Sequence, residues 1–206
     1  MLKFDQKYIT WDCETEGLNL KYSRPWELSY LICQGNKILK KRQMYIDIEG
    51  LYLKPLIKKL CNFDQKKYDR EKIPPQEAWD EFKELLYNPD YKLIGQNVLK
   101  YDIHILAILS EICEEDIDFS FIDRIFDTRP LAVAEKNNLE KPRKGDIVQW
   151  QYKVLADPNL KQRGVSQGML LKYFGIEHDP NRLHSGLYDI QMTWEIFKQL
   201  KKILEL

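Results

Sequence analysis

The sequence predicts an α/β fold, in which a mixed sheet has an antiparallel hairpin at its edge and carries helices on both sides. Three strand-like segments come first, and the second and third meet at Gly35-Asn36, a pair that favours a tight hairpin turn. Helical and short strand-like segments then alternate, which is typical of helices packed on a sheet. We expect the 206 residues to form one domain.

The first part of the chain supplies the hairpin and the first helices. Residues 8–14 are rich in β-branched and aromatic residues and favour a strand. Residues 27–34 and 37–46 form the predicted hairpin. A helix is expected over residues 53–60, and a clearer one opens at Pro75, because apolar residues follow it at helical spacing.

Further along the chain, short strands are expected at residues 93–97 and 124–128. Helices are expected at residues 102–113, from Pro130, at residues 165–174 and from Ser185. Residues 136–164 interrupt this alternation, since they hold prolines, glycines and seven Lys or Arg against three Asp or Glu. We predict an inserted basic loop region there.

Composition limits the possible partners. Lys and Arg balance Asp and Glu at 32 each, so any contact with a polyanion must be local or metal-mediated. The four cysteines are scattered, which favours reduced core thiols over zinc ligands. No apolar run resembles a signal peptide or a membrane span. A soluble, cytoplasmic protein without a membrane partner is therefore expected.

Asp12 and Glu14 are the first candidates for a metal site. Side chains alternate along a strand, so both carboxylates point to one face and an apolar face backs them. Two adjacent anions repel each other unless a cation is present, and Mg²⁺ or Mn²⁺ takes carboxylate oxygens. Two other Asp-x-Glu pairs, which begin at Asp47 and Asp69, lie in a predicted turn and a predicted loop.

Two carboxylates further along the chain could complete this site. Asp102 follows a strand and a Gly/Asn turn, where capping of the next helix is the alternative role. Asp189 is expected in the middle of the last helix, beside its apolar stripe, where a surface ion pair is the alternative. Histidine as a residue type titrates near neutrality and can take a proton from water, which makes His184 a candidate base. A satisfied surface or core histidine is the alternative there.

Taken together, these segments resemble the DnaQ-like 3′→5′ exonucleases of the ribonuclease H-like superfamily, in the Asp-Glu-Asp-Asp-His (DEDDh) subgroup. The motifs stand here as Asp12-x-Glu14-Thr15-x-Gly17-Leu18, as Gly95-x-Asn97 leading to Tyr101-Asp102, and as His184 with Asp189. Phe126-Asp127-Thr128 and Tyr173-Phe174-Gly175 match subsidiary family features. The sister subgroup has tyrosine where Ser185 stands, which favours the histidine branch. Gln96 and Gly186 depart from the usual His and Ala.

The resemblance implies a ribonuclease H-like sheet and a two-metal 3′→5′ exonuclease. It would hydrolyse phosphodiesters at the 3′ end of single-stranded nucleic acid, with DNA favoured, and release nucleoside 5′-monophosphates in proofreading or repair. By resemblance, two Mg²⁺ or Mn²⁺ ions would be held by Asp12, Glu14, Asp102 and Asp189, with His184 as the general base. The terminal nucleotide would meet Thr15, Gly17, Leu18, Asn97 and Tyr101. Core packing is the alternative for Leu18 and Tyr101.

Other functions remain compatible with the sequence. One is a trimmer of RNA 3′ ends that resembles RNase T or oligoribonuclease, and another is a catalytically silent binding module. Silent copies usually lose a carboxylate, and all four are present here. A DNA polymerase partner is a further expectation, and the oligomeric state is open. In the basic region, charge and stacking could guide a strand along Lys141, Arg143, Lys144, Trp150 and Tyr152, with a solvated loop as the alternative.

Overall fold

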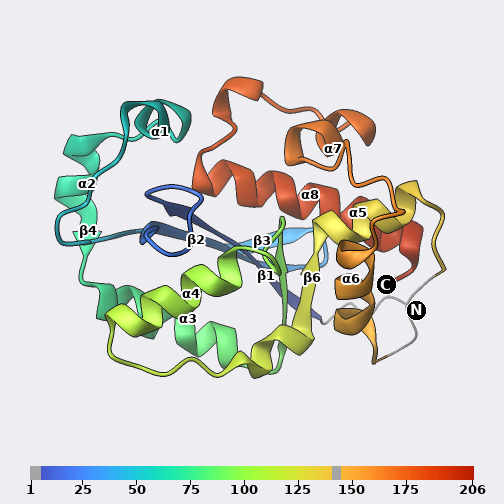
Figure 1. The fold of residues 1–206 in the computed structure, drawn as a ribbon, viewed down its shortest axis with the longest axis horizontal. Coiled ribbons are helices and arrows are strands. Elements are labelled where there is room, and N and C mark those ends of the chain that lie inside the picture. The colour runs from blue at the N-terminus through green and yellow to red at the C-terminus, as the bar shows by residue number, and fades with distance from the viewer. Residues whose placement is uncertain (1–5, 141–144) are drawn as a thin grey trace.

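A computed structural model describes residues 6–140 and 145–206. Its centre is a six-stranded mixed sheet in the order β4-β3-β2-β1-β5-β6 (Figure 1). The strands are β1 (Lys7–Thr15), β2 (Pro25–Gln34), β3 (Lys37–Ile46), β4 (Lys72–Ile73), β5 (Tyr91–Gly95) and β6 (Ile125–Asp127). β2 pairs antiparallel with both β1 and β3, and the other neighbours pair parallel. The predicted fold class is confirmed.

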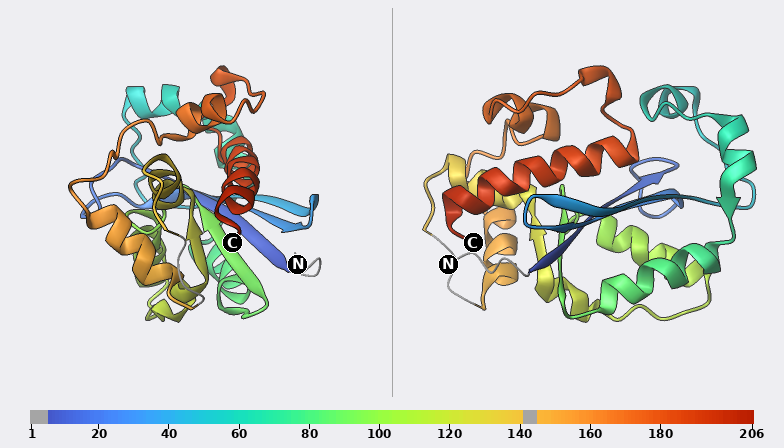
Figure 2. Two further views of the ribbon diagram at one scale, coloured as in Figure 1. Left: turned by 90° about the vertical axis from the view of Figure 1, so that its right-hand side faces the viewer. Right: turned by 180° about the vertical axis from the view of Figure 1, so that it is seen from behind.

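Helices cover both faces of this sheet (Figures 1 and 2). They are α1 (Pro55–Leu60), α2 (Gln65–Glu71), α3 (Pro75–Tyr87), α4 (Asp102–Ile112), α5 (Thr128–Lys136), α6 (Ile147–Ala156), α7 (Gln167–Tyr173) and α8 (Gly186–Leu204). Two short 3-10 helices, η1 (Phe119–Arg124) and η2 (Pro180–Arg182), lie between them. No helix in the described part of the chain is long and apolar enough to cross a membrane.

The alternation of side chains along β1 divides the core into two halves. Trp11 points to the α3–α4 face, where its ring centroid lies 5.6 Å from that of Phe82. Tyr8 points to the opposite face, where its ring lies 5.4 Å from Trp194 of α8. The even-numbered face of β1 therefore turns toward α8. This places the side chains at positions 12 and 14 beneath the start of that helix.

The interpretation of residues 136–164 as a loop is wrong over α6. This helix buries Val154 and Leu155 together with the polar Gln151. The polar residue weakens the apolar spacing by which an amphipathic helix is recognised in a sequence. Helix α2 and the two-residue β4 were also not predicted. The basic residues Lys141, Arg143 and Lys144 lie outside the described residues.

Candidate active site

Strand β1 carries Asp12 and Glu14 to the end of the sheet on the α8 face. In the antiparallel register Asp12 lies opposite Ser29, and Glu14 lies opposite Glu27. Cross-strand neighbours have Cβ atoms about 4.5–5.5 Å apart, and like charges in such a pair destabilise it. A third acidic side chain, from β2, therefore adjoins the pair that the sequence predicted.

Asp102 joins this cluster from α4. It is 3% exposed, and its Oδ1 accepts a hydrogen bond from the Cys13 backbone N–H at 3.1 Å. The alternative that Asp102 caps the helix is wrong, because Tyr101 occupies the N-cap and Asp102 is the first helical residue. The bond to Cys13 fixes the Asp102 carboxylate against β1, between Asp12 and Glu14 along the chain.

Asp189 and His184 come from the start of α8. The helix begins at Gly186, so Asp189 lies in its first turn, and the expectation of a mid-helix position is wrong. Asp189 Oδ2 accepts a hydrogen bond from the His184 backbone N–H at 2.9 Å. His184 is exposed and has a left-handed backbone with φ of 66°, a conformation that His adopts more readily than most residues. The two residues are thus coupled through the backbone.

Burial and mutual repulsion raise the pKa of every carboxyl group in this cluster. Burial, and then the charge of Glu27, raise the pKa of Asp12 from 3.8 to about 7. Burial, and then the charge of Asp12, raise the pKa of Asp189 from 3.8 to about 8. The same two causes hold the pKa of Glu14 and of Asp102 well above the usual range. The charge of Asp12 acts on all three predicted partners, so Asp12 is the electrostatic centre of the site.

This cluster has the chemistry of a hard-cation site. The four predicted ligands are carboxylates, which Mg²⁺ and Mn²⁺ prefer, and Asp189 Oδ1 is buried with no hydrogen-bond partner in the described structure. Among the described residues no three acidic, histidine or cysteine side chains already converge to hold one ion. Asp12 and Glu14 are only partly buried. Rotation of their side chains could therefore bring carboxylate oxygens together around a cation.

Two neighbours of Glu14 were not found by sequence reasoning. Cys61, which follows α1, donates its thiol to Glu14 Oε2 at 3.1 Å. Glu27 is 4% exposed, and its Oε1 accepts a hydrogen bond from Ser29 Oγ at 2.8 Å. Neither residue belongs to a local motif in the sequence. Only the pairing of β2 with β1 and the return of α1 toward the sheet bring them to Glu14.

The residues predicted to meet the terminal nucleotide are only partly brought together. Tyr101 Oη donates a short hydrogen bond to the Gly17 carbonyl and lies 2.8 Å from Thr15 Oγ1, which ties the turn after β1 to the start of α4. Leu18 is 89% exposed, so the alternative of core packing is wrong for it. In the described part of the chain Asn97 makes no such bond to Tyr101 or the turn, and its backbone N–H donates instead to Asp127 Oδ1 at 2.7 Å.

Asp127 is a buried anchor for the segment that leads to Asp102. Its carboxylate accepts backbone N–H groups from Asn97 at 2.7 Å, Leu99 at 3.0 Å and Arg129 at 2.9 Å. Burial raises its pKa from 3.8 to about 6, although these hydrogen bonds oppose the rise. Gln151 of α6 accepts the backbone N–H of Asp127 at 2.7 Å. The sequence signal for Asp127 was present only as part of a subsidiary family feature.

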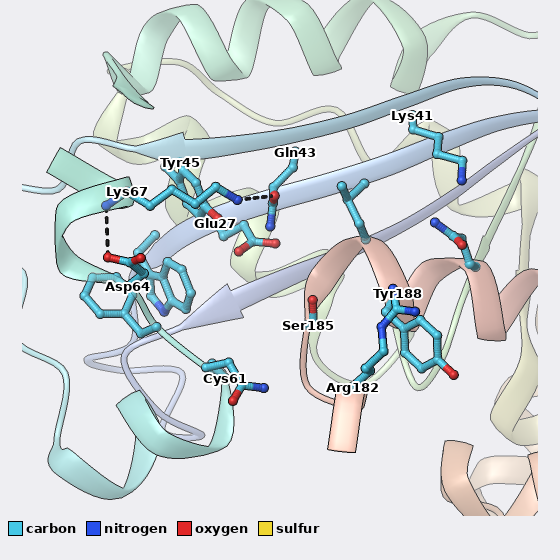
Figure 3. A pocket seen from close by; sticks show the side chains of 15 residues that line it. Glu27, Lys41, Gln43, Tyr45, Cys61, Asp64, Lys67, Arg182, Ser185 and Tyr188 are labelled. Carbon is cyan, nitrogen blue, oxygen red and sulfur yellow. Dashed lines mark hydrogen bonds between the residues drawn. The ribbon is translucent and has the colours of Figure 1, made fainter. Parts of the chain in front are cut away.

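A cavity of about 400 Å³ lies beside Glu27, between the α1–α2 connection, β2–β3 and the start of α8 (Figure 3). Its lining includes Glu27, Cys61 and Ser185, and also the cations Lys41, Lys67 and Arg182. Lys67 donates to Gln43 at 3.2 Å, and Arg182 lies 4.4 Å from the centroid of the Tyr188 ring. The basic side chains near the site are therefore partly engaged with its own walls.

Comparison with known proteins identifies the family. The model of the family described as RNase_T, Exonuclease, matches residues 9–197. The chain belongs to this exonuclease family. No curated protein matches the sequence.

Solved structures of exonuclease I share the fold of this exonuclease. One, reported to suggest how processivity is achieved, has a TM-score of 0.72 at 15% identity over 97% of this chain and 42% of that chain. Escherichia coli exonuclease I with a dT13 oligonucleotide gives 0.70 at 15% identity over 97% and 42%. The zinc-bound complex of the E. coli enzyme with single-stranded DNA gives 0.70 at 14% identity over 96% and 41%. The chain thus spans about two-fifths of the length of these proteins.

The family match and the shared fold confirm the recognition of a DnaQ-like exonuclease with a ribonuclease H-like sheet. The DEDDh subgroup stays a prediction, since it depends on the role of His184. The roles of the individual site residues also stay predictions.

Proposed function

We propose that this exonuclease is a metal-dependent 3′→5′ exonuclease that removes nucleotides from single-stranded ends, with DNA favoured, and releases nucleoside 5′-monophosphates. The observation that carries this proposal is that β1, α4 and α8 place Asp12, Glu14, Asp102 and Asp189 in one cluster, in which burial and then the charge of Asp12 raise the pKa of the other three carboxyl groups. Exonuclease I structures of similar fold contain dT13 and dA16 oligonucleotides, which supports single-stranded DNA as the substrate.

The four carboxylates would hold two Mg²⁺ or Mn²⁺ ions. When bound, such ions neutralise the charge that develops on a phosphodiester and activate water as a nucleophile. The chain contributes fixed ligands: the Cys13 N–H orients Asp102, and the His184 N–H orients Asp189. Asp12, whose charge acts on the other three carboxyl groups, would hold the metal together with them. The four predicted metal ligands lie on β1, α4 and α8, so they come together only when these three elements are folded against one another.

His184 is assigned the proton-transfer step. A ring nitrogen of its imidazole would accept the proton of the attacking water, a step that histidine side chains commonly perform as general bases. The hydrogen bond from its backbone N–H to Asp189 holds residue 184 beside this carboxylate. On the α4 side, Tyr101 closes the turn onto Gly17. The exposed Leu18 is then free to pack beside the last base.

The test is incubation of a 5′-labelled single-stranded DNA, and of the RNA of the same sequence, with Mg²⁺ or Mn²⁺. A ladder that shortens stepwise from the 3′ end of the DNA is the expected result, and chelation by EDTA should abolish it. A ladder on the RNA alone would assign the site to RNA trimming. Binding of both strands without cleavage would favour the silent module, and cleavage of a closed circle would reject an exonuclease.

Three wider expectations belong with this proposal. We take residues 1–206 to act as one exonuclease domain. A polymerase partner with a role in proofreading or repair, and a cytoplasmic location, stay predictions. A role in proofreading or repair requires removal of nucleotides from a DNA 3′ end, and the incubation described above tests for that reaction.

A further inference from the structure

Gly186, the first residue of α8, lies directly against the buried carboxylate of Glu27. A Cβ at position 186 would lie 2.0 Å from Glu27 Oε1 and 2.8 Å from Ser29 Oγ, which is closer than any side chain can approach. Glu27 and Ser185 line the same cavity, and Figure 3 shows the Glu27 carboxylate between Gln43 and the start of α8. The carboxylate therefore occupies the space that an ordinary side chain at 186 would fill.

Glu27 is held in this place from several directions. Its Oε1 accepts a hydrogen bond from Ser29 Oγ at 2.8 Å. Burial raises the pKa of the Glu27 carboxyl, while hydrogen bonds from Gln43 and Ser29 and the charge of Lys67 oppose the rise. Lys67 in turn donates to Gln43 at 3.2 Å. To make room for a methyl group at 186, Glu27 would have to leave these partners in a site where an unpaired polar group is costly.

The contact lies at the point where α8 meets the two strands of the site. Glu27 is opposite Glu14 in the register of β2 with β1. Gly186 opens the helical turn that contains Asp189, and Asp189 binds the backbone of His184. The separation of α8 from β2 at Gly186 thus determines how far the Asp189 carboxylate is from Asp12 and Glu14.

We propose that Glu27 and Gly186 form a matched pair that sets how closely the first turn of α8 approaches β1 and β2. Glu27 is then a positioning residue that acts through α8 on Asp189 and His184. The Glu27 carboxylate fills the space that a methyl group at position 186 would occupy.

A double-mutant cycle on the full chain tests the pair. Gly186→Ala and Glu27→Ala should each weaken Mn²⁺ binding, measured by calorimetry, by about 10–100-fold, the usual loss when a residue that orients metal ligands is changed. Each should also lower the melting temperature by several degrees. In the double variant the methyl group enters the space that the carboxylate has left, so its Mn²⁺ affinity should be no weaker than that of either single variant.

Two further variants separate this role from others. Gly168→Ala in the first turn of α7 is the matched control. Its Cβ would meet Leu183 Cδ1 at 3.3 Å and no carboxylate, so the change should leave Mn²⁺ affinity unchanged with or without Glu27→Ala. Glu27→Gln keeps the shape and should stay within about threefold of the wild-type Mn²⁺ affinity, well below the loss expected for an orienting residue. A loss as large as that of Asp12→Asn would make Glu27 a metal ligand and overturn the positioning role.

The link of this pair to metal binding rests on the proposed function, and the cycle distinguishes the two failures. Two results would overturn the pair even if the wild type degrades DNA. One is a double variant in which the two losses of Mn²⁺ affinity multiply, and the other is a Gly186→Ala variant with wild-type affinity and melting temperature. A wild type without metal binding or nuclease activity rejects the proposed function. In that case the pair is decided by whether the two changes in melting temperature add.

Discussion

Asp12→Asn should stabilise the metal-free exonuclease at neutral and alkaline pH, even though it removes the central metal ligand. The Asp12 carboxyl is partly buried, and burial and then the charge of Glu27 raise its pKa from 3.8 to about 7. Between these two values the native state binds a proton that the unfolded chain has already lost. The stability of the wild type must therefore fall as pH rises through this window. Asparagine has the same shape and no charge, so it escapes this loss.

The size of the effect follows from the same pKa values. The difference between 3.8 and about 7 corresponds to up to about 4 kcal/mol at pH 8, at 1.36 kcal/mol for each pKa unit. At pH 4 the free energies of unfolding of the wild type and Asp12→Asn should differ by less than about 1 kcal/mol, because the Asp12 carboxyl of the unfolded chain is then about half protonated. The advantage of Asp12→Asn should thus grow between pH 4 and pH 7 and level off above it.

Urea unfolding in EDTA at several pH values measures this difference. Asp116→Asn, which removes an exposed carboxylate outside the site, is the control and should follow the wild type at every pH. Addition of Mn²⁺ should then stabilise the wild type, since a ligand that binds only the native state raises its stability, and should do far less for Asp12→Asn. If Asp12→Asn unfolds like the wild type at both ends of the pH range, the carboxylates do not repel one another as inferred.

Three further substitutions test individual contacts. His184→Asn keeps a residue that tolerates the left-handed backbone, so Mn²⁺ affinity should persist while the rate at pH 7 falls by about 10²–10⁴-fold. This loss of rate should shrink toward alkaline pH. Near-wild-type activity at pH 7 would remove the histidine from the mechanism. Asp127→Ala leaves three backbone N–H groups without their acceptor and should cost about 2–5 kcal/mol in urea unfolding, whereas a cost below about 1 kcal/mol would contradict its anchoring role. Tyr101→Phe breaks the bond to the Gly17 carbonyl and should raise KM for DNA with little change in Mn²⁺ affinity, so an unchanged KM would separate this turn from substrate binding.

The features that sequence reasoning predicted are local ones. Asp12 and Glu14 could be placed on one face because strand alternation depends only on neighbouring residues. The hairpin at Gly35-Asn36 was predicted by two turn residues between apolar runs, and the structure has it between β2 and β3. The order of the three motifs along the chain then indicated the family that the residue 9–197 match confirms.

The features that were missed depend on contacts between distant segments. Glu27 reaches Glu14 only through the register of β2 on β1, and Cys61 only through the path of the chain after β3. Asp127 stands out in the sequence only as part of a subsidiary family feature at a short strand. Two of its three backbone partners, Asn97 and Leu99, come from the segment after β5. The close approach at Gly186 is likewise invisible until α8 is docked on the sheet.

The most direct test of a 3′→5′ exonuclease built on Asp12 is the identity of the first product. A single-stranded DNA with a labelled 3′-terminal nucleotide is mixed with excess enzyme and Mg²⁺ or Mn²⁺, and the label is followed by chromatography. The account predicts that the label leaves in the first turnover as a nucleoside 5′-monophosphate, and that Asp12→Asn and EDTA both prevent its release. Three results would contradict the account: release of the label within a longer fragment, release of the label as a nucleoside 3′-monophosphate, or release by Asp12→Asn at the wild-type rate.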